Sequence, residues 1–160
     1  MTAASWRIGI DTPEYEADSL SGKGAEKQGG RWNRVGSAVV YSSSSIALSC
    51  LETVVHLNTD DGLPFNRFLV RIDIPDEIWS ARVILTAAHL PIGWESTPKG
   101  KVSLDVGEAW LRSMKSAVLA VPSAIVPEEY NVLINAGHPE ASRIKAQKVR
   151  RWLYDGRLIK

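Results

Sequence analysis

The sequence is poor in the residue types that build disulfides and metal sites. Cys50 is the single cysteine among 160 residues, so the chain can form neither an internal disulfide nor a cysteine-based metal cage. It lies in an apolar stretch, where we expect it to be buried as a small hydrophobic residue. The three histidines form no HxxxH or HxH pair. The sequence therefore predicts no metal ion.

An excess of one charge and a long apolar run are also absent. The 19 basic and 18 acidic residues leave a net charge of +1, which does not favour nucleic acid or an anionic membrane as a partner. The N-terminus lacks the pattern of a signal peptide, and no segment reaches the roughly 20 apolar residues of a membrane span. With 44% hydrophobic residues the chain can bury a core. We expect one soluble, cytoplasmic domain over residues 1–160.

Local patterns predict alternating strands and helices. A glycine-rich loop is expected over residues 18–30, a strand over 38–41, and a serine-capped helix over 45–57. Period-two alternation predicts a strand over 67–74. Further strands are expected over residues 82–86, 118–126 with a break at Pro122, and 149–154.

A last helix is expected to open at Asp105, because Glu108 three residues later completes a capping box. Its buried stripe would comprise Val106, Trp110, Met114 and Ala117. Helices do not separate the strands regularly, which argues against a doubly wound sheet. We predict an α+β domain with a mixed central sheet and flanking helices.

The segment GGRWN, residues 29–33, is a candidate binding loop. Paired glycines allow the backbone to approach a ligand, and the guanidinium of Arg31 could clamp a pyrophosphate. Asn33 adds a hydrogen-bonding amide. The alternative interpretation is a turn with a surface arginine.

Two further candidates have weaker sequence support. Tyr41 ends a predicted strand, where its ring could stack on nicotinamide and its hydroxyl could bond a phosphate or a sugar; alternatively it is a half-buried strand tyrosine. Ser123 lacks the GxSxG setting of an esterase nucleophile, which leaves only a binding role open.

Glu52 is the candidate carboxylate. It lies in the middle of a predicted helix, where Ser45, Ser49 and His56 project to the same side and apolar residues border it. This position would partly shelter the carboxylate, although most helical glutamates are solvated surface charges.

Several segments, taken in order, resemble the RES-domain family, which takes its name from an arginine, a glutamate and a serine. The likeness covers nearly the whole chain, with one departure: Ala136 stands where the family often has proline after the asparagine of LIN. The matching segments are WR at residues 6–7, SGKGAEKQGGRWN, VVYSSSSIALSCLETVVHL, IDIP, LPIGW, GEAWL, VPSAIVPEEYNVLINAGHP and YDGRL.

The resemblance implies an ADP-ribosyltransferase-like fold and a toxin that cleaves the bond between nicotinamide and ribose in NAD. NAD is then the substrate, and no cofactor is required. The residues that match as catalytic are Arg31, Tyr41 and Glu52. The residues that match as NAD-binding are Arg7, Gly30, Arg31, Asn33, Tyr41, Ser42, Ser123 and Asn135.

This chemistry suits a sheltered carboxylate, because cleavage of an N-glycosidic bond develops positive charge on the ribose. The acceptor of the ribosyl group is open: water, phosphate or a protein side chain. We rank NAD hydrolysis or phosphorolysis above protein ADP-ribosylation, because the short chain shows no distinct segment for recognising an acceptor.

The resemblance also implies a toxin-antitoxin system. The partner would be an Xre-like helix-turn-helix antitoxin, and operator DNA would be contacted only through the complex. Two rival functions remain. A noncatalytic interaction module would fit the tryptophan content, whereas an endoribonuclease would be expected to show a basic face that the charge balance does not indicate.

Overall fold

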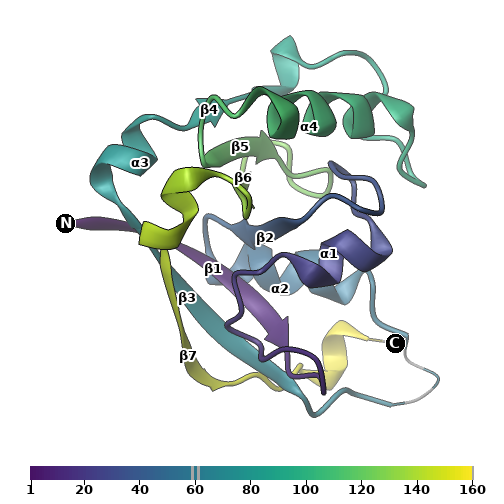
Figure 1. Cartoon of the computed structure of the whole chain (residues 1–160). Helices are drawn as coiled ribbons and strands as arrows, with labels where there is room; N and C mark the ends of the chain where they lie inside the picture. Colours follow the sequence, from purple (N-terminus) through teal and green to yellow (C-terminus); the bar gives the residue numbers. More distant parts are fainter. Residues whose placement is uncertain (59, 61, 160) are drawn as a thin grey trace.

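The chain folds around one seven-stranded mixed β-sheet with helices packed against it (Figure 1). The computed structural model describes residues 1–58, 60 and 62–159. The strands are β1 (Thr2–Ile10), β2 (Val39–Ser43), β3 (Arg67–Pro75), β4 (Val83–Ile84), β5 (Val118–Pro122), β6 (Tyr130–Asn135) and β7 (Lys145–Arg151). The α-helices are α1 (Lys23–Gln28), α2 (Ile46–Val54), α3 (Asp76–Ser80) and α4 (Lys101–Ser113). This architecture confirms the α+β prediction.

The sheet consists of two well-paired groups that meet at a narrow junction. The strand order is β4-β5-β6-β2-β1-β3-β7, and among the described strand pairs only β4 and β5 run parallel. β1 pairs with β3 along its whole length, from Thr2–Pro75 to Ile10–Arg67. In contrast, within the described chain β1 pairs with β2 only at Trp6 and Ser43. Beyond this pair the two strands separate.

Hydrophobic clusters fill both faces of the sheet. Val40 belongs to a cluster of aliphatic residues, whereas its neighbours Val39 and Tyr41 belong to a second cluster that contains Trp32, Trp94 and Trp110. Successive residues of a strand point to opposite faces, so the two clusters lie on opposite sides of β2.

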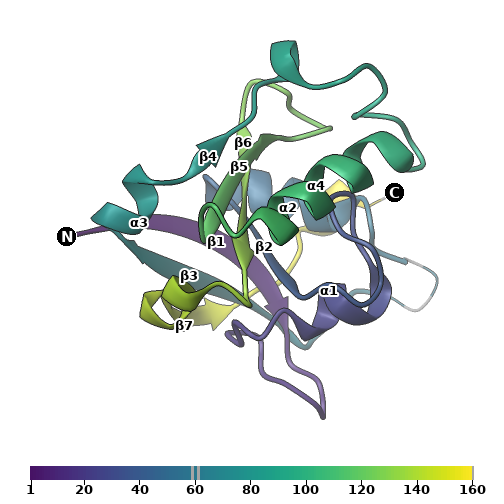
Figure 2. The same cartoon turned by 45° about the horizontal axis from the view of Figure 1, so that its top comes forward.

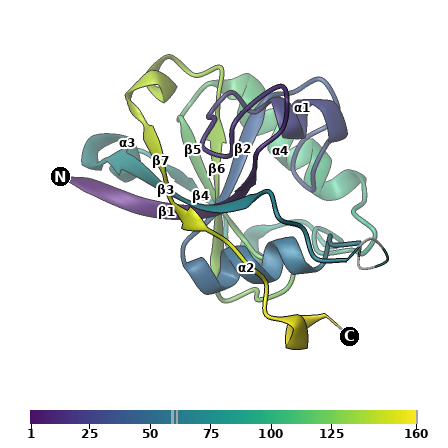
Figure 3. The same ribbon diagram turned by 90° about the horizontal axis from the view of Figure 1, so that it is seen from below.

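The helices are placed at different ends of the central strands. α2 follows β2 directly and lies near the end of β2 and β6 that carries Ser43 and Asn131. α4 lies near the other end of β6, where Asn135 Nδ2 donates to the carbonyl oxygen of Leu111 (Figures 2 and 3). No helix in the described part of the chain is long and apolar enough to cross a membrane.

Several predicted elements are confirmed. α2, β2, β3, β4 and β5 lie where the sequence predicted them, within a few residues, and Pro122 ends β5. β7 begins four residues before the predicted strand and ends before Tyr154. β1 and β6 were not predicted. The segment expected as a loop over residues 18–30 contains α1.

The predicted capping box at Asp105 and Glu108 is wrong. α4 begins at Lys101, after Gly100, so both acidic residues lie inside the helix. Glu108 is turned inward, where it binds a backbone amide of another segment. Met114 is exposed and ends the helix with a φ of 54°, so it is not part of the buried stripe.

Cys50 is half-buried, not fully buried as predicted. Burial raises the pKa of its thiol, which keeps the sulfur protonated and weakly reactive.

Candidate functional site

Glu52 lies in the last turn of α2, half-buried, with its hydrogen bonds concentrated on one oxygen. Ser45 caps the helix by accepting from the backbone N–H of Leu48 at 3.1 Å. Glu52 Oε1 accepts from Ser123 Oγ at 2.6 Å and from Asn131 Nδ2 at 2.8 Å. No hydrogen bond to Oε2 is found among the described residues. One carboxylate oxygen is thus fixed, and the other is left available.

Ser123 serves as an anchor for this carboxylate. It is fully buried, and besides donating to Glu52 its Oγ accepts from the backbone N–H groups of Ile125 and Val126 at 3.0 and 3.1 Å. These contacts use the whole hydrogen-bonding capacity of the hydroxyl. The structure therefore places Ser123, a predicted binding residue, beside Glu52. The hydrogen-bond partners of its hydroxyl all come from the protein itself.

Tyr41 uses its hydroxyl within the protein. The hydroxyl donates to Asn33 Oδ1 at 2.7 Å and accepts from the backbone N–H of Trp32 at 3.0 Å. Burial raises the pKa of the phenol, so Tyr41 stays neutral at physiological pH. The side chain as a whole is partly buried, and its hydroxyl already has two partners within the protein.

Asn33 and Gly30 shape the GGRWN loop around Tyr41. Asn33 is fully buried, and its Nδ2 contacts the carbonyl oxygens of Ala25, Arg34 and Ser37. A Cβ on Gly30 would lie 2.6 Å from the Tyr41 hydroxyl, so glycine is required here for packing. The structure therefore uses both predicted binding residues to hold the loop.

Arg31 is anchored at one end of its guanidinium group. Its Nη1 donates to the carbonyl oxygens of Trp94 and Ser96 at 3.0 and 2.9 Å. The neighbouring Trp32 stacks on Trp94 with ring centroids 6.1 Å apart. These contacts fix residues 94–96 beside the GGRWN loop. Within the described chain, Nε and Nη2 of Arg31 have no hydrogen-bond partner.

Arg7 lies on β1 just beyond the Trp6–Ser43 pair, where the strands separate. It is half-buried, and the loss of hydration lowers the pKa of its guanidinium. The described residues supply it with neither a salt bridge nor a hydrogen bond. Because Trp6 shares the face of Ser43 and Tyr41, alternation along β1 points Arg7 to the opposite face, together with Ser42.

Ser42 faces away from Tyr41. Its Oγ donates to the carbonyl oxygen of Val132 at 2.8 Å and lies 2.9 Å from Ser5 Oγ. The side chain is 4% exposed and points to the face of the sheet opposite Tyr41 and Ser43. The structure does not bring this predicted residue to the face occupied by Tyr41.

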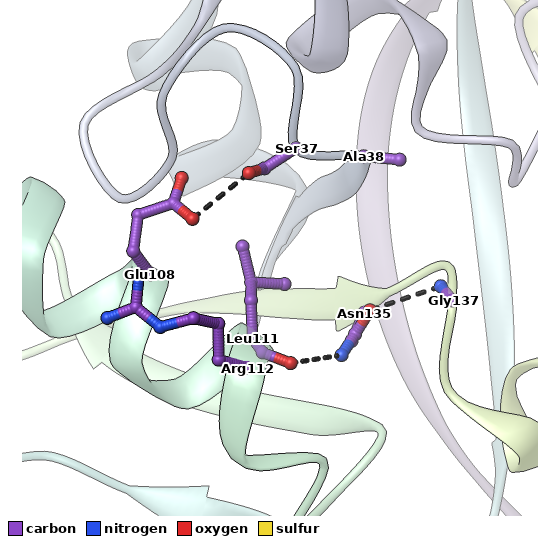
Figure 4. Close-up of a pocket in the computed structure, with 7 residues that line it drawn as sticks. All are labelled: Ser37, Ala38, Glu108, Leu111, Arg112, Asn135 and Gly137. Carbon is purple, nitrogen blue, oxygen red and sulfur yellow. Dashed lines mark hydrogen bonds between the residues drawn. The ribbon is translucent and has the colours of Figure 1, made fainter.

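Asn135 is far from Glu52 along the sheet. It ends β6 opposite Val39, whereas Asn131 pairs with Ser43 at the other end of the same ladder. Asn135 contacts the carbonyl oxygen of Leu111 and the backbone of Gly137 and borders a second polar group formed by Glu108 and Ser37 (Figure 4). A shallow cavity of about 230 Å³ lies there.

The described residues contain no group of three or more His, Cys, Asp or Glu side chains suited to a metal ion. His56, expected beside Glu52, is exposed, and neither it nor Ser49 is among the hydrogen-bond partners of Glu52.

Two residues near Glu52 were missed by the sequence analysis. Asn131 donates to Glu52, and Ser43 Oγ donates to Asn131 Oδ1 at 2.8 Å. The motif VPSAIVPEEYNVLIN contains Asn131, but its contact with Glu52 depends on the pairing of β6 with β2.

The fold and this polar site define a class: an α+β protein with a half-buried glutamate and two incompletely paired arginines beside a split sheet. A family model described as the RES domain matches residues 4–155. The chain therefore belongs to the RES domain family.

Relatives extend the match over the whole chain. The Prs ADP-ribosylating toxin of Sphingobium sp. (strain YBL2) is 56% identical over 160 residues, covering 100% of this chain and 99% of the relative. A protein named Toxin Res from Yersinia enterocolitica is 41% identical over 125 residues, 78% of this chain and 79% of the relative. Toxin Res from Pseudomonas putida is 36% identical over 141 residues, 88% of this chain and 92% of the relative.

Proposed function

We propose that this chain is a toxin that uses NAD as substrate, cleaves the nicotinamide–ribose bond and transfers ADP-ribose to a protein acceptor. The observation that carries the proposal is the half-buried Glu52, with Oε1 held by Ser123 and Asn131 and Oε2 unbound within the described residues.

Glu52 stabilises the positive charge that develops on the ribose as the bond to nicotinamide breaks. The electron pair of the breaking C–N bond goes to the nicotinamide nitrogen, which is cationic in NAD and leaves neutral, so no strong acid is required. The free Oε2 either faces the ribose directly or holds its 2′-hydroxyl. Shelter from water strengthens this electrostatic contribution.

Arg31 binds the NAD phosphates in this proposal. It presents the Nε and Nη2 edge of its guanidinium, a geometry suited to a bidentate contact with phosphate oxygens. Tyr41 offers its ring for stacking on nicotinamide, because its hydroxyl is occupied by Asn33 and Trp32.

A protein acceptor is supported by the full-length similarity to a Prs ADP-ribosylating toxin. The new bond joins the ribose C1′ to a nucleophilic side chain of the acceptor, which loses a proton. NAD hydrolysis or phosphorolysis, which the sequence analysis ranked first, becomes the second candidate, because water or phosphate can complete the same first half-reaction.

We further propose that an Xre-like helix-turn-helix antitoxin neutralises the toxin and that operator DNA is contacted only through their complex. The near-zero net charge agrees with a toxin that does not bind DNA by itself.

The test uses NAD radiolabelled in its adenylate half, incubated with purified protein alone, with phosphate, and with the Prs protein of the same genome. We expect release of nicotinamide together with label on the acceptor, and neither product from Glu52→Gln. Nicotinamide release with label only on ADP-ribose or its phosphate would favour the second candidate. No release under any condition would overturn NAD use.

A further inference from the structure

We propose that Asn131 is a positioning residue that fixes the carboxylate of Glu52 so that only Oε2 faces the substrate. The proposal rests on the proposed function of Glu52 and assigns Asn131 a role that it performs through Glu52. Three observations support it: the direction of the hydrogen bonds, their origin in separate elements, and the location of Ser43.

The orientation of the Asn131 amide follows from its contact with Glu52. An ionised carboxylate can only accept hydrogen bonds, so the group 2.8 Å from Glu52 Oε1 is the Nδ2 amine. The Oδ1 end then faces Ser43, whose hydroxyl donates to it at 2.8 Å. The Ser43 hydroxyl can both donate and accept, so the acceptor-only carboxylate of Glu52 is the partner that fixes the orientation of the amide.

The two side chains that donate hydrogen bonds to Glu52 come from different parts of the fold. Asn131 is on β6, and Ser123 follows β5, whereas Glu52 is on α2. Because both donate to the same oxygen, they define the rotation of the carboxylate and leave the second oxygen free of protein contacts among the described residues. If Ser123 alone held Glu52, the carboxylate could still rotate about that one hydrogen bond.

Ser43 links this arrangement to the junction of the sheet. It is the β2 residue that pairs with Trp6 of β1, the one pair among the described residues that joins the two groups of strands. Asn131 pairs with Ser43 across β2 and β6, on the same face as Tyr41. The position of the Glu52 carboxylate is therefore fixed relative to the junction of the sheet. From this junction β1, which carries Arg7, diverges.

The first test is Asn131→Ala. Loss of one charge-assisted hydrogen bond to Glu52 should lower kcat for nicotinamide release by about ten-fold or more, with KM for NAD changed less than about two-fold, because ground-state binding does not use this bond. The matched control is Asn66→Ala. Asn66 is an exposed asparagine that bonds the carbonyl oxygen of Asp11, and its removal should leave kcat unchanged.

The second test is Asn131→Asp, which yields a pH signature. When two carboxyl groups are adjacent, the pair keeps a proton to a higher pH than an isolated carboxyl group would. While the introduced carboxyl group carries the proton, it can donate to Glu52 as the amide does. Activity should therefore be partly restored in acidic solution and fall as the pH rises and the proton is lost, whereas Asn131→Ala should show the pH dependence of the wild type.

These outcomes separate positioning from a merely structural role. Unchanged kcat in Asn131→Ala, or identical pH profiles for Asn131→Asp and Asn131→Ala in folded proteins, would overturn the proposal. The failure of NAD use would be recognised separately, as absence of nicotinamide release by the wild type. In that case NMR still decides: the side-chain amide signals of Asn131, identified by their loss in Asn131→Asp, should shift in Glu52→Ala, and unmoved signals would overturn the proposal.

Discussion

Glu52 and Glu108 occupy opposite ends of the central strands and differ in how their oxygens are used. Glu108 is 8% exposed, and each oxygen has its own donor: Oε1 accepts from the backbone N–H of Arg34 at 2.7 Å and Oε2 from Ser37 Oγ at 3.0 Å (Figure 4). Glu52 is more exposed, and both of its donors converge on Oε1. Both oxygens of Glu108 are thus hydrogen-bonded within the fold, whereas Glu52 is held through one oxygen.

The comparison shows that shelter alone does not mark a functional carboxylate. Glu108 is the better buried of the two, yet it has no unsatisfied oxygen with which to bind a ligand. Arg31 follows the pattern of Glu52, since its hydrogen bonds to the described residues all come from Nη1. Partial satisfaction of a firmly held charged group is the feature that distinguishes the candidate site.

The largest effect is expected for Glu52→Gln. Glutamine keeps an oxygen that can accept from Ser123 and Asn131, so the side chain should stay in place while its charge is lost. We expect kcat to fall by about 100-fold or more, with a Tm within about 2 °C of the wild type. Steady-state nicotinamide release and thermal unfolding measure the two quantities. Near-normal turnover in the folded variant would remove Glu52 from the mechanism.

A smaller loss is expected for Arg31→Lys. Lysine keeps the charge but has no second donor edge, so it cannot hold residues 94–96 and a phosphate at once. NAD turnover should fall about ten-fold or more. Hydrogen exchange of residues 94–96 without NAD separates the two contributions, because only loosening of this segment raises exchange there. Wild-type activity in Arg31→Lys would show that a diffuse positive charge suffices.

Glu108→Gln should lower stability and leave kcat nearly unchanged, the opposite of the effect expected for Glu52→Gln. The amide cannot accept at both ends, so the Arg34 N–H or the Ser37 hydroxyl loses its acceptor. We expect a loss of about 2–3 kcal/mol in the free energy of unfolding and a kcat within about two-fold of the wild type. Denaturant unfolding provides the measurement. A large loss of kcat without destabilisation would break the contrast between the two glutamates.

The smallest effect is expected for Tyr41→Phe. The ring that would stack on nicotinamide is retained, and only the bonds to Asn33 and Trp32 are lost. The free energy of unfolding should fall by about 1–2 kcal/mol, with activity within about three-fold of the wild type. Tyr41→Ala should be inactive, and its stability must be compared with that of Tyr41→Phe. An inactive, stable Tyr41→Phe would assign the hydroxyl to catalysis.

Local sequence patterns predicted the elements whose signals are local. Three patterns could be recognised because each lies within about ten residues: the Ser45 cap, the apolar spacing of α2 and the alternation of β3. β1 was missed because Ala3, Ala4 and Gly9 obscure its alternation. The capping box was misassigned because an acidic residue followed by glutamate three positions later also occurs inside helices.

The candidate site was predictable only in part. The family resemblance pointed to Glu52 and Ser123 but not to their hydrogen bond, which joins residues 71 positions apart. The amide of Asn131 meets Glu52 across 79 positions, through the pairing of β6 with β2. Asn33 and Ser42 were interpreted as ligand contacts, whereas the structure commits their polar atoms to the protein. No local pattern distinguishes a donor aimed at a ligand from one aimed at another strand.

The long separations within the Glu52 site have a consequence for the timing of synthesis. A ribosome that has just made Glu52 must add 79 more residues before Asn131 exists. At 5–20 residues per second this takes roughly 4 to 16 s. Until Ser123 is made, 71 residues after Glu52, the nascent chain has its carboxylate but neither donor to hold it. In the proposed mechanism, NAD cleavage therefore has to wait until most of the chain has been made and folded.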